Sequence, residues 1–184
     1  MQEKSMKQRL TRVVFALLLA GCILMGNTPN VYAEDDTFYA EYLAKKAAGI
    51  EVYEIVSEEG VLMGYFQPYS DTDAQTMQTR AATTSYIDWE IIAGNYGYGS
   101  NKYSLKQYDN VEVKISQNPS GAGCVSYVGL RDEDTGMVGF ADSTITTNGW
   151  DGVILVGYDG NFSLAIRNAS PYTIRYTGNY SILE

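Results

Sequence analysis

Aromatic rings set among small polar residues are the feature of this sequence that points most directly to chemistry. The chain has 16 tyrosines and only five phenylalanines. Tyr96, Tyr98 and Tyr103 lie in or beside a glycine-containing loop, and Trp150 is flanked by glycine, asparagine and aspartate. Exposed rings of this kind can stack on sugar faces or anchor a protein contact. These four residues are therefore predicted ligand-binding residues. The alternative is that the tyrosines pack at sheet edges with their hydroxyls in water.

A run of acids at Asp132, Glu133 and Asp134 suggests calcium, which binds protein oxygens in a defined loop pattern. Asp132 and Asp134 are the candidate metal ligands, and calcium is the only cofactor that the sequence suggests. The run departs from the EF-hand pattern, because Gly136 follows Thr135 where a further acid is expected. The sequence favours the alternative that these acids belong to a solvated turn.

Asp88 and Glu90 are two residues apart in a strand pattern, so both side chains are expected on one face. Two carboxylates held across a cleft could hydrolyse a glycoside, which makes a carboxylate-only hydrolase one alternative function. Two acids on the solvent face of a strand are the commoner arrangement, and the sequence favours it.

The chain contains no histidine. Nucleophiles activated by histidine and metal sites built on histidine are therefore excluded. Once an export signal is removed, Cys124 is the remaining cysteine, so a structural zinc site is excluded as well. Cys124 opens an apolar strand pattern and is predicted to be a small buried side chain. We expect a protein that is not an enzyme.

The N-terminus has the pattern of an export signal. Four basic residues precede an apolar run at residues 13–25, which is shorter than the roughly 20 residues that a helix needs to cross a bilayer. An A-x-A-like site ends at Ala33. We expect cleavage there and a secreted protein with no transmembrane span. An alternative is that Cys22 in Leu-Ala-Gly-Cys is a lipidation site, which would anchor the protein to a membrane.

The predicted mature chain is strongly acidic. Residues 1–33 hold four of the 13 basic residues and one of the 22 acidic residues, which leaves nine basic and 21 acidic residues and a net charge of −12. Phosphate backbones are repelled by such a surface, so nucleic acid is not an expected partner. A protein or a glycan at the cell surface remains as the expected partner.

Short strand patterns dominate the chain after residue 85. Apolar Phe162, Leu164 and Ile166 alternate with small or polar residues, and residues 153–156 form a continuous apolar run. About eight strands separated by turn residues predict a mainly β protein, an antiparallel β-sandwich of jelly-roll or Ig-like type. Gly178 interrupts the last pattern and predicts a bulge or a turn into a separate short strand.

Four segments are expected. Residues 1–33 are the signal peptide, and residues 34–66 form a short helix from Thr37 followed by a β-hairpin. The polar stretch 67–85 has no apolar period and reads as a linker. Residues 86–184 form the β-sandwich domain.

Part of the C-terminal region resembles a known family. Residues 159–168 and 172–174 resemble the closing strands of secreted bacterial prepeptidase C-terminal-type domains, and residues 128–132 loosely resemble their middle strand. The resemblance implies an accessory, usually non-catalytic β-sandwich in an exported protein. An Asp-rich strand that many such domains carry is missing here, so no calcium ligands are transferred from the family. Together these patterns predict an exported binding or adhesion-type domain, with a carbohydrate-binding module as an alternative.

Overall fold

The computed structural model describes residues 37–69, 82–121, 123–141 and 149–183. One helix, α2, spans Thr37–Ala47. Eleven strands follow it: β1 Tyr53–Ser57, β2 Leu62–Pro68, β3 Ala82–Ile91, β4 Tyr96–Tyr98, β5 Tyr103–Leu105, β6 Asn110–Asn118, β7 Ser126–Asp132, β8 Val138–Ala141, β9 Gly149–Val156, β10 Gly160–Asn168 and β11 Ile174–Leu183. The predicted signal sequence, its cleavage site and Cys22 lie outside the described residues. Across the described part of the chain, no helix has the length and apolar content of a membrane span.

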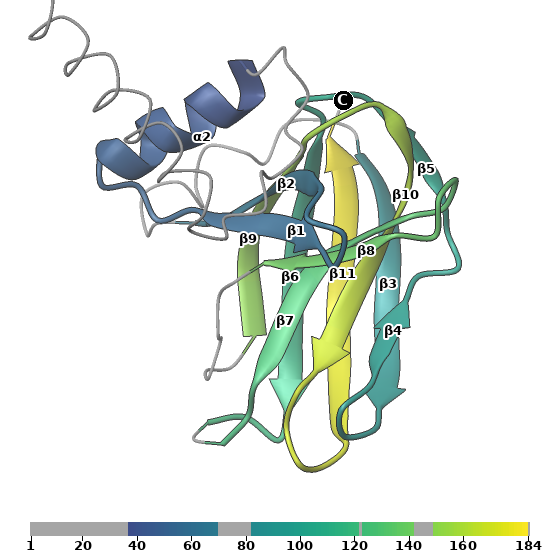
Figure 1. The fold of residues 1–184 in the computed structure, drawn as a ribbon. Helices are drawn as coiled ribbons and strands as arrows, with labels where there is room; N and C mark the ends of the chain where they lie inside the picture. The colour runs from purple at the N-terminus through teal and green to yellow at the C-terminus, as the bar shows by residue number, and fades with distance from the viewer. Residues whose placement is uncertain (1–36, 70–81, 122, 142–148, 184) are drawn as a thin grey trace, which may run out of the picture. The chain divides into compact units, whose positions relative to one another are not determined.

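All eleven strands belong to one antiparallel sheet (Figure 1). Its order is β3-β11-β6-β9-β2-β1-β8-β7-β10-β4, and β5 extends the pairing along β10. The two end strands, β3 and β4, follow each other in the chain, so the sheet curls until its ends meet and comes close to a barrel.

Asn168 at the end of β10 binds the end of β3 and the segment that joins the two end strands, β3 and β4. Its side-chain Nδ2 donates a hydrogen bond to the Ile91 carbonyl at 2.8 Å, and its backbone N–H donates to the Asn95 carbonyl at 2.8 Å. Both acceptors lie at or just after the end of β3. Because Asn168 is fully buried, these bonds are shielded from water. They fix the position of the segment between the end of β3 and the start of β4.

The predicted mainly β, antiparallel architecture is confirmed. The observed sheet differs from the expected division into a hairpin segment, a linker and a separate β-sandwich domain. β2 pairs with β9, and β1 pairs with β8, so the hairpin supplies two central strands. β3 begins at Ala82, inside the stretch expected to be linker. Apolar alternation indicates which face of a strand is buried, but not which strands are neighbours, and this explains the difference.

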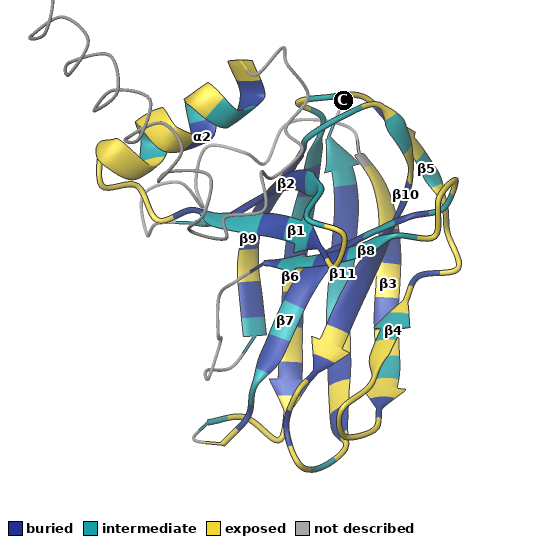
Figure 2. Ribbon diagram, in the orientation of Figure 1, coloured by how far each residue is buried: buried dark blue, intermediate teal, exposed yellow. Residues whose placement is uncertain are grey.

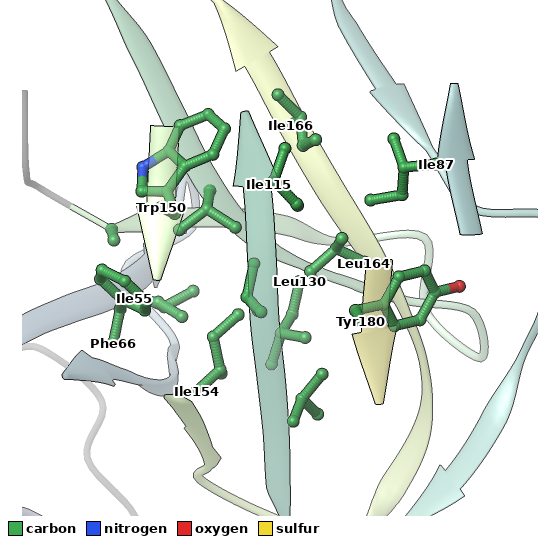
Figure 3. Close-up of a cluster of buried hydrophobic side chains, with 14 of the residues drawn as sticks. Ile55, Phe66, Ile87, Ile115, Leu130, Trp150, Ile154, Leu164, Ile166 and Tyr180 are labelled. Carbon is green, nitrogen blue, oxygen red and sulfur yellow. The ribbon is translucent and has the colours of Figure 1, made fainter. Parts of the chain in front are cut away.

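The main core lies inside the curled sheet. On β6, Val111, Val113 and Ile115 are buried while the residues between them are not, and Figure 2 shows similar alternating bands along β3. Side chains from β6, β9 and β11 meet those from β7 and β10, as Figure 3 shows. Each fully buried Val, Leu or Ile stabilises the fold by about 1.5–3 kcal/mol.

Strand β9 is covered on both faces, as its continuous apolar run predicts. Ile154 and Val156 face the main core, whereas Val153 and Leu155 face a second cluster on the outside of the sheet. Helix α2 covers that second cluster with the buried rings of Phe38 and Tyr42.

The helix is docked on the sheet, as its apolar stripe predicts. Phe38 and Tyr42 are spaced i, i+4 and are both buried, and their rings lie 5.2 and 5.8 Å from the ring of Tyr65 on β2. Tyr65 also donates a hydrogen bond to Glu41 at 3.2 Å, and Lys45 donates to Gln67 at 3.1 Å. The helix thereby shields the outer face of β2 from solvent.

The prediction that Gly178 breaks the last strand is wrong. β11 runs from Ile174 to Leu183 and stays in continuous register with both β3 and β6. Gly178 is nevertheless required, because its φ is +147° and an added Cβ would lie 2.1 Å from the Lys114 carbonyl oxygen. The glycine therefore permits a close approach between strands and marks neither a turn nor a strand end.

Candidate functional site

A pocket of about 360 Å³ opens on the outside of the curled sheet. It is formed by the β1–β2 turn, the β7–β8 turn, and strands β4, β8 and β10. We call it the aromatic pocket; its lining residues are Glu58, Glu59, Gly94, Tyr96, Gly136, Met137, Val138, Phe140 and Arg167. Its volume falls in the range of about 300–1,000 Å³ that is usual for small-molecule sites.

Strand β4 brings two tyrosines to this outer surface. Tyr96 pairs with Arg167 and Tyr98 pairs with Ala165 on β10. Both rings are about half exposed, at 51% and 49%, and their centroids are 6.3 Å apart. Gly97 lies between them, against the Ile91 side chain. Two of the four aromatic residues predicted to bind a ligand are therefore exposed side by side.

Strand β8 supplies a second ring to the pocket lining, Phe140, which contacts Tyr96. The rings of Tyr96 and Phe140 lie 6.0 Å apart in an edge-to-face arrangement. This contact spans β10 and β7, the two strands between β4 and β8 in the sheet order. β8 can come this close because β7 has Gly129, where an added Cβ would lie 1.9 Å from the Gly139 carbonyl oxygen.

Two arginines flank the exposed rings, and they differ in the contacts that their guanidinium groups make. The Arg131 guanidinium lies 4.0 Å from the centre of the Tyr98 ring, and its Nε is 3.8 Å from Glu133. Arg167 is exposed, and within the described residues its guanidinium has no ion-pair or hydrogen-bond partner. Arg167 therefore presents donors at the pocket that no other described residue accepts from.

The β7–β8 turn forms one wall of the pocket, and Asp132 shapes that turn. Asp132 is 3% exposed, and its Oδ1 accepts hydrogen bonds from the backbone N–H groups of Asp134 at 2.8 Å and Thr135 at 3.2 Å. Its Oδ2 accepts from the Tyr158 hydroxyl at 3.0 Å. Burial opposes ionisation of Asp132, but these hydrogen bonds outweigh it and lower the pKa of the carboxyl.

The expectation that the acids of this turn are solvated is wrong for Asp132 and Glu133. Glu133 is held by Lys102 at 2.9 Å and by Ser163 at 2.7 Å, and the hydrogen bond with Lys102 is the main cause of its lowered pKa. Asp134 is exposed but accepts three hydrogen bonds from Asn161. These acids thus connect the turn to β10 and to Lys102, the residue before β5.

Calcium at Asp132 and Asp134 would have to displace the hydrogen bonds that already occupy their oxygens. Among the residues that the structure describes, no three or more His, Cys, Asp or Glu side chains form a group that could hold a metal ion. The donor set therefore does not fit a calcium site, which needs six or more oxygens.

Trp150 and Tyr103 do not belong to the exposed aromatic surface. Trp150 is 2% exposed and stacks on Tyr176 with ring centroids 5.9 Å apart, inside the main core (Figure 3). Tyr103 hydrogen-bonds Ser85 on β3 and packs edge-on against Tyr180. The prediction that these rings bind a ligand is corrected: Trp150 fills the core, and Tyr103 ties β5 to β3 and β11.

Asp88 and Glu90 lie on the outer face of β3, as the strand pattern predicts, but they do not form a hydrolytic pair. Asp88 accepts two hydrogen bonds from Arg175, both at 2.7 Å, and this pairing lowers the pKa of its carboxyl. Arg175 is also the register partner of Glu90. A general acid for glycoside cleavage needs a raised pKa, so Asp88 is suited to an ion pair and not to proton donation.

Cys124 is completely buried, as predicted for a small apolar side chain. Its Sγ lies 3.0 Å from the Tyr172 hydroxyl and 3.2 Å from the Pro119 carbonyl. These contacts hold the loop before β7 against the chain that leads into β11 and leave the thiol inaccessible.

Sequence reasoning missed Phe140, Arg167 and the pair Glu58 and Glu59. A hairpin within residues 34–66 and short strands after residue 85 were expected, so the kinds of element that carry these residues were predicted. Nothing in the sequence indicates that β8 crosses toward β4 or that the β1–β2 turn reaches the same place. A signal was present only for Arg167, which is the one charged residue of the β10 segment.

Comparison of the chain with protein-family models, with curated proteins and with solved structures found no match. The resemblance of residues 159–168 and 172–174 to prepeptidase C-terminal-type domains thus remains a prediction. The candidate site rests on the geometry of the aromatic pocket.

Proposed function

We propose that this chain is an exported, non-catalytic binding protein that holds its ligand in the aromatic pocket, at or outside the cell surface. The observation that carries the proposal is the contact between Tyr96 and Phe140 beside Arg167, whose guanidinium has no ion-pair or hydrogen-bond partner among the described residues. Exposed aromatic rings and arginine are residue types that anchor ligands and partners at protein surfaces.

Export is supported by the basic and apolar pattern of residues 1–33. Lipid attachment at Cys22 is the alternative, and the two differ in the mature N-terminus. Mass spectrometry should find a chain that begins at Glu34. A lipid-modified N-terminal Cys22 would instead place the protein on a membrane.

The absence of catalysis is supported by the side chains available. The sequence has no histidine, Asp88 is paired with Arg175, and Asp132 accepts three hydrogen bonds. Lowered pKa values for both aspartates favour ionised, structural carboxylates over proton donors.

The resemblance to an accessory, non-catalytic domain is consistent with this function. We also propose that the curled sheet is a β-sandwich of two layers. Support comes from the core, where side chains of β6 and β9 pack against those of β7 and β10. A protein or a glycan is the proposed partner. Nucleic acid is disfavoured by the net charge of −9 for the whole chain.

Co-sedimentation of the purified mature protein with isolated cell envelopes tests the proposal. Tyr96→Ala and Arg167→Ala should each reduce the bound fraction severalfold. Tyr86→Ala is the matched control, because Tyr86 is the most exposed of the large apolar or aromatic residues described, at 83%, and does not line the pocket. Equal loss in all three variants, or in none, would refute the aromatic pocket as the binding site.

A further inference from the structure

The aromatic pocket combines three kinds of group that one ligand class uses together. Tyr96 and Phe140 provide ring surface, Arg167 provides hydrogen-bond donors, and Glu58 and Glu59 provide carboxylate acceptors. In the described part of the chain, neither glutamate side chain has a hydrogen-bond or ion-pair partner. A sugar unit presents an apolar C–H face and several hydroxyl groups. Each hydroxyl can both donate and accept a hydrogen bond.

The charges at the pocket decide between sugar types. Glu58 and Glu59 contribute two negative charges against the single positive charge of Arg167, and the whole chain is acidic. A uronate, sulfate or phosphate group would gain from Arg167 but would be repelled by both glutamates. An uncharged sugar can use all three side chains without that repulsion.

We infer that the aromatic pocket binds an uncharged sugar unit of a glycan, stacked on Tyr96 and hydrogen-bonded by Arg167 and the two glutamates. The inference rests on the proposed function and names its ligand class. Tyr98 lies beside the site, with its ring centroid 6.3 Å from that of Tyr96, and the Arg131 guanidinium packs over the Tyr98 ring at 4.0 Å. Met137 and Val138 line the pocket on the side of the β7–β8 turn, and the hydrogen bonds of Asp132 fix that turn in place.

Affinity gel electrophoresis tests the inference with the full mature chain. Native gels would contain mannan, xylan, laminarin or dextran as uncharged probes and polygalacturonate as an anionic one, and a printed array of neutral glycans widens the search. At least one uncharged probe should retard the protein. Tyr96→Ala and Arg167→Ala should weaken that binding at least tenfold, whereas Tyr86→Ala should change it less than twofold.

Replacing the two glutamates by glutamine distinguishes a sugar from a basic peptide. The double variant Glu58→Gln with Glu59→Gln keeps hydrogen-bonding oxygens but removes both charges, so binding to a neutral glycan should fall only a few-fold. Binding to a basic peptide from a peptide array would fall tenfold or more.

Absence of retardation by every uncharged polysaccharide and of any hit on the neutral array would overturn the inference. If envelope binding still depended on Tyr96 in that case, the proposed function would stand with a different ligand class. Preferred binding of polygalacturonate or of basic peptides would also overturn it. Circular dichroism of each variant confirms that the exposed substitutions leave the fold intact.

Discussion

The ring of Phe140 on β8 meets the ring of Tyr96 on β4 with centroids 6.0 Å and planes 64° apart. The two residues are 44 positions apart in the sequence and come from strands separated in the sheet by β7 and β10. Phe140 is paired with Gly129 on β7, and Figure 1 shows β8 crossing in front of β7 and β10. This crossing creates the aromatic pocket.

Gly129→Ala should disturb that crossing. The new Cβ would lie 1.9 Å from the Gly139 carbonyl oxygen, so β8 must shift, at a cost of about 1–3 kcal/mol in the free energy of unfolding. Gly97→Ala is the control, because there the nearest atom is the tip of the Ile91 side chain at 3.1 Å. Urea unfolding measures both, and equal stability of the two variants would contradict the close approach of β8.

Asp132→Asn should loosen the turn that forms the pocket wall. The amide nitrogen cannot accept the hydrogen bond from Tyr158, and the charge that strengthens the two backbone bonds is lost. We expect a loss of about 1–3 kcal/mol at pH 7. Asp151→Asn is the control, because Asp151 is half exposed and its Lys114 partner lies 4.0 Å away.

Acid should remove the contribution of Asp132 in the wild-type protein. Its pKa is lowered in the folded state, so its stabilisation is present above the ordinary pKa of about 3.9 and is lost as the pH falls below it. The difference in unfolding free energy between wild type and Asp132→Asn should therefore shrink between pH 5 and pH 2. A constant difference over that range would show that the carboxylate charge contributes nothing.

Alkali should destabilise the core through buried phenols. Burial is the main cause that raises the pKa of Tyr176 and of Tyr180 to about 12. Because both values lie above the ordinary pKa of about 10, their stabilisation is complete below pH 10 and is lost as the pH rises toward 12. Ultraviolet titration should show late-ionising tyrosines whose titration coincides with unfolding. Complete tyrosine ionisation in a still folded protein by pH 11 would contradict this.

Trp150→Ala should be the most damaging of these substitutions. It removes a ring that is 2% exposed and stacked on Tyr176, which leaves a large cavity in the main core. The expected cost is about 3–5 kcal/mol in the free energy of unfolding, whereas Tyr86→Ala on the exposed face of β3 should cost under about 0.5 kcal/mol. Chemical denaturation compares the two variants, and a small effect of Trp150→Ala would mean that its ring is a surface ring after all.

Residue types and their alternation were sufficient to predict three of the local elements. Phe38 and Tyr42 predict the docked helix face, Val111 to Ile115 predict a strand with one buried face, and the apolar run at residues 153–156 predicts a strand covered on both sides. These patterns are local, because side-chain direction repeats every 3.6 residues in a helix and every two in a strand.

The candidate site was only partly visible, since exposure depends on what packs nearby. Tyr96 and Trp150 both follow asparagine and glycine-containing stretches, yet one ring is half exposed and the other is in the core. Asp132 looks like a solvated turn acid in the sequence, but it ends β7, is buried and accepts a hydrogen bond from Tyr158.

By itself, the sequence determined that the chain is mainly β, that a helix precedes the strands and that histidine chemistry is unavailable. Only the tertiary structure decided that β1 and β2 lie in the centre of the sheet and that Tyr96, Phe140 and Arg167 share one pocket. The physical reason is that hydrophobic burial is non-directional. It specifies which side chains turn inward, whereas strand order and the crossing of β8 depend on pairings and close approaches between distant segments, such as Gly129 with Gly139.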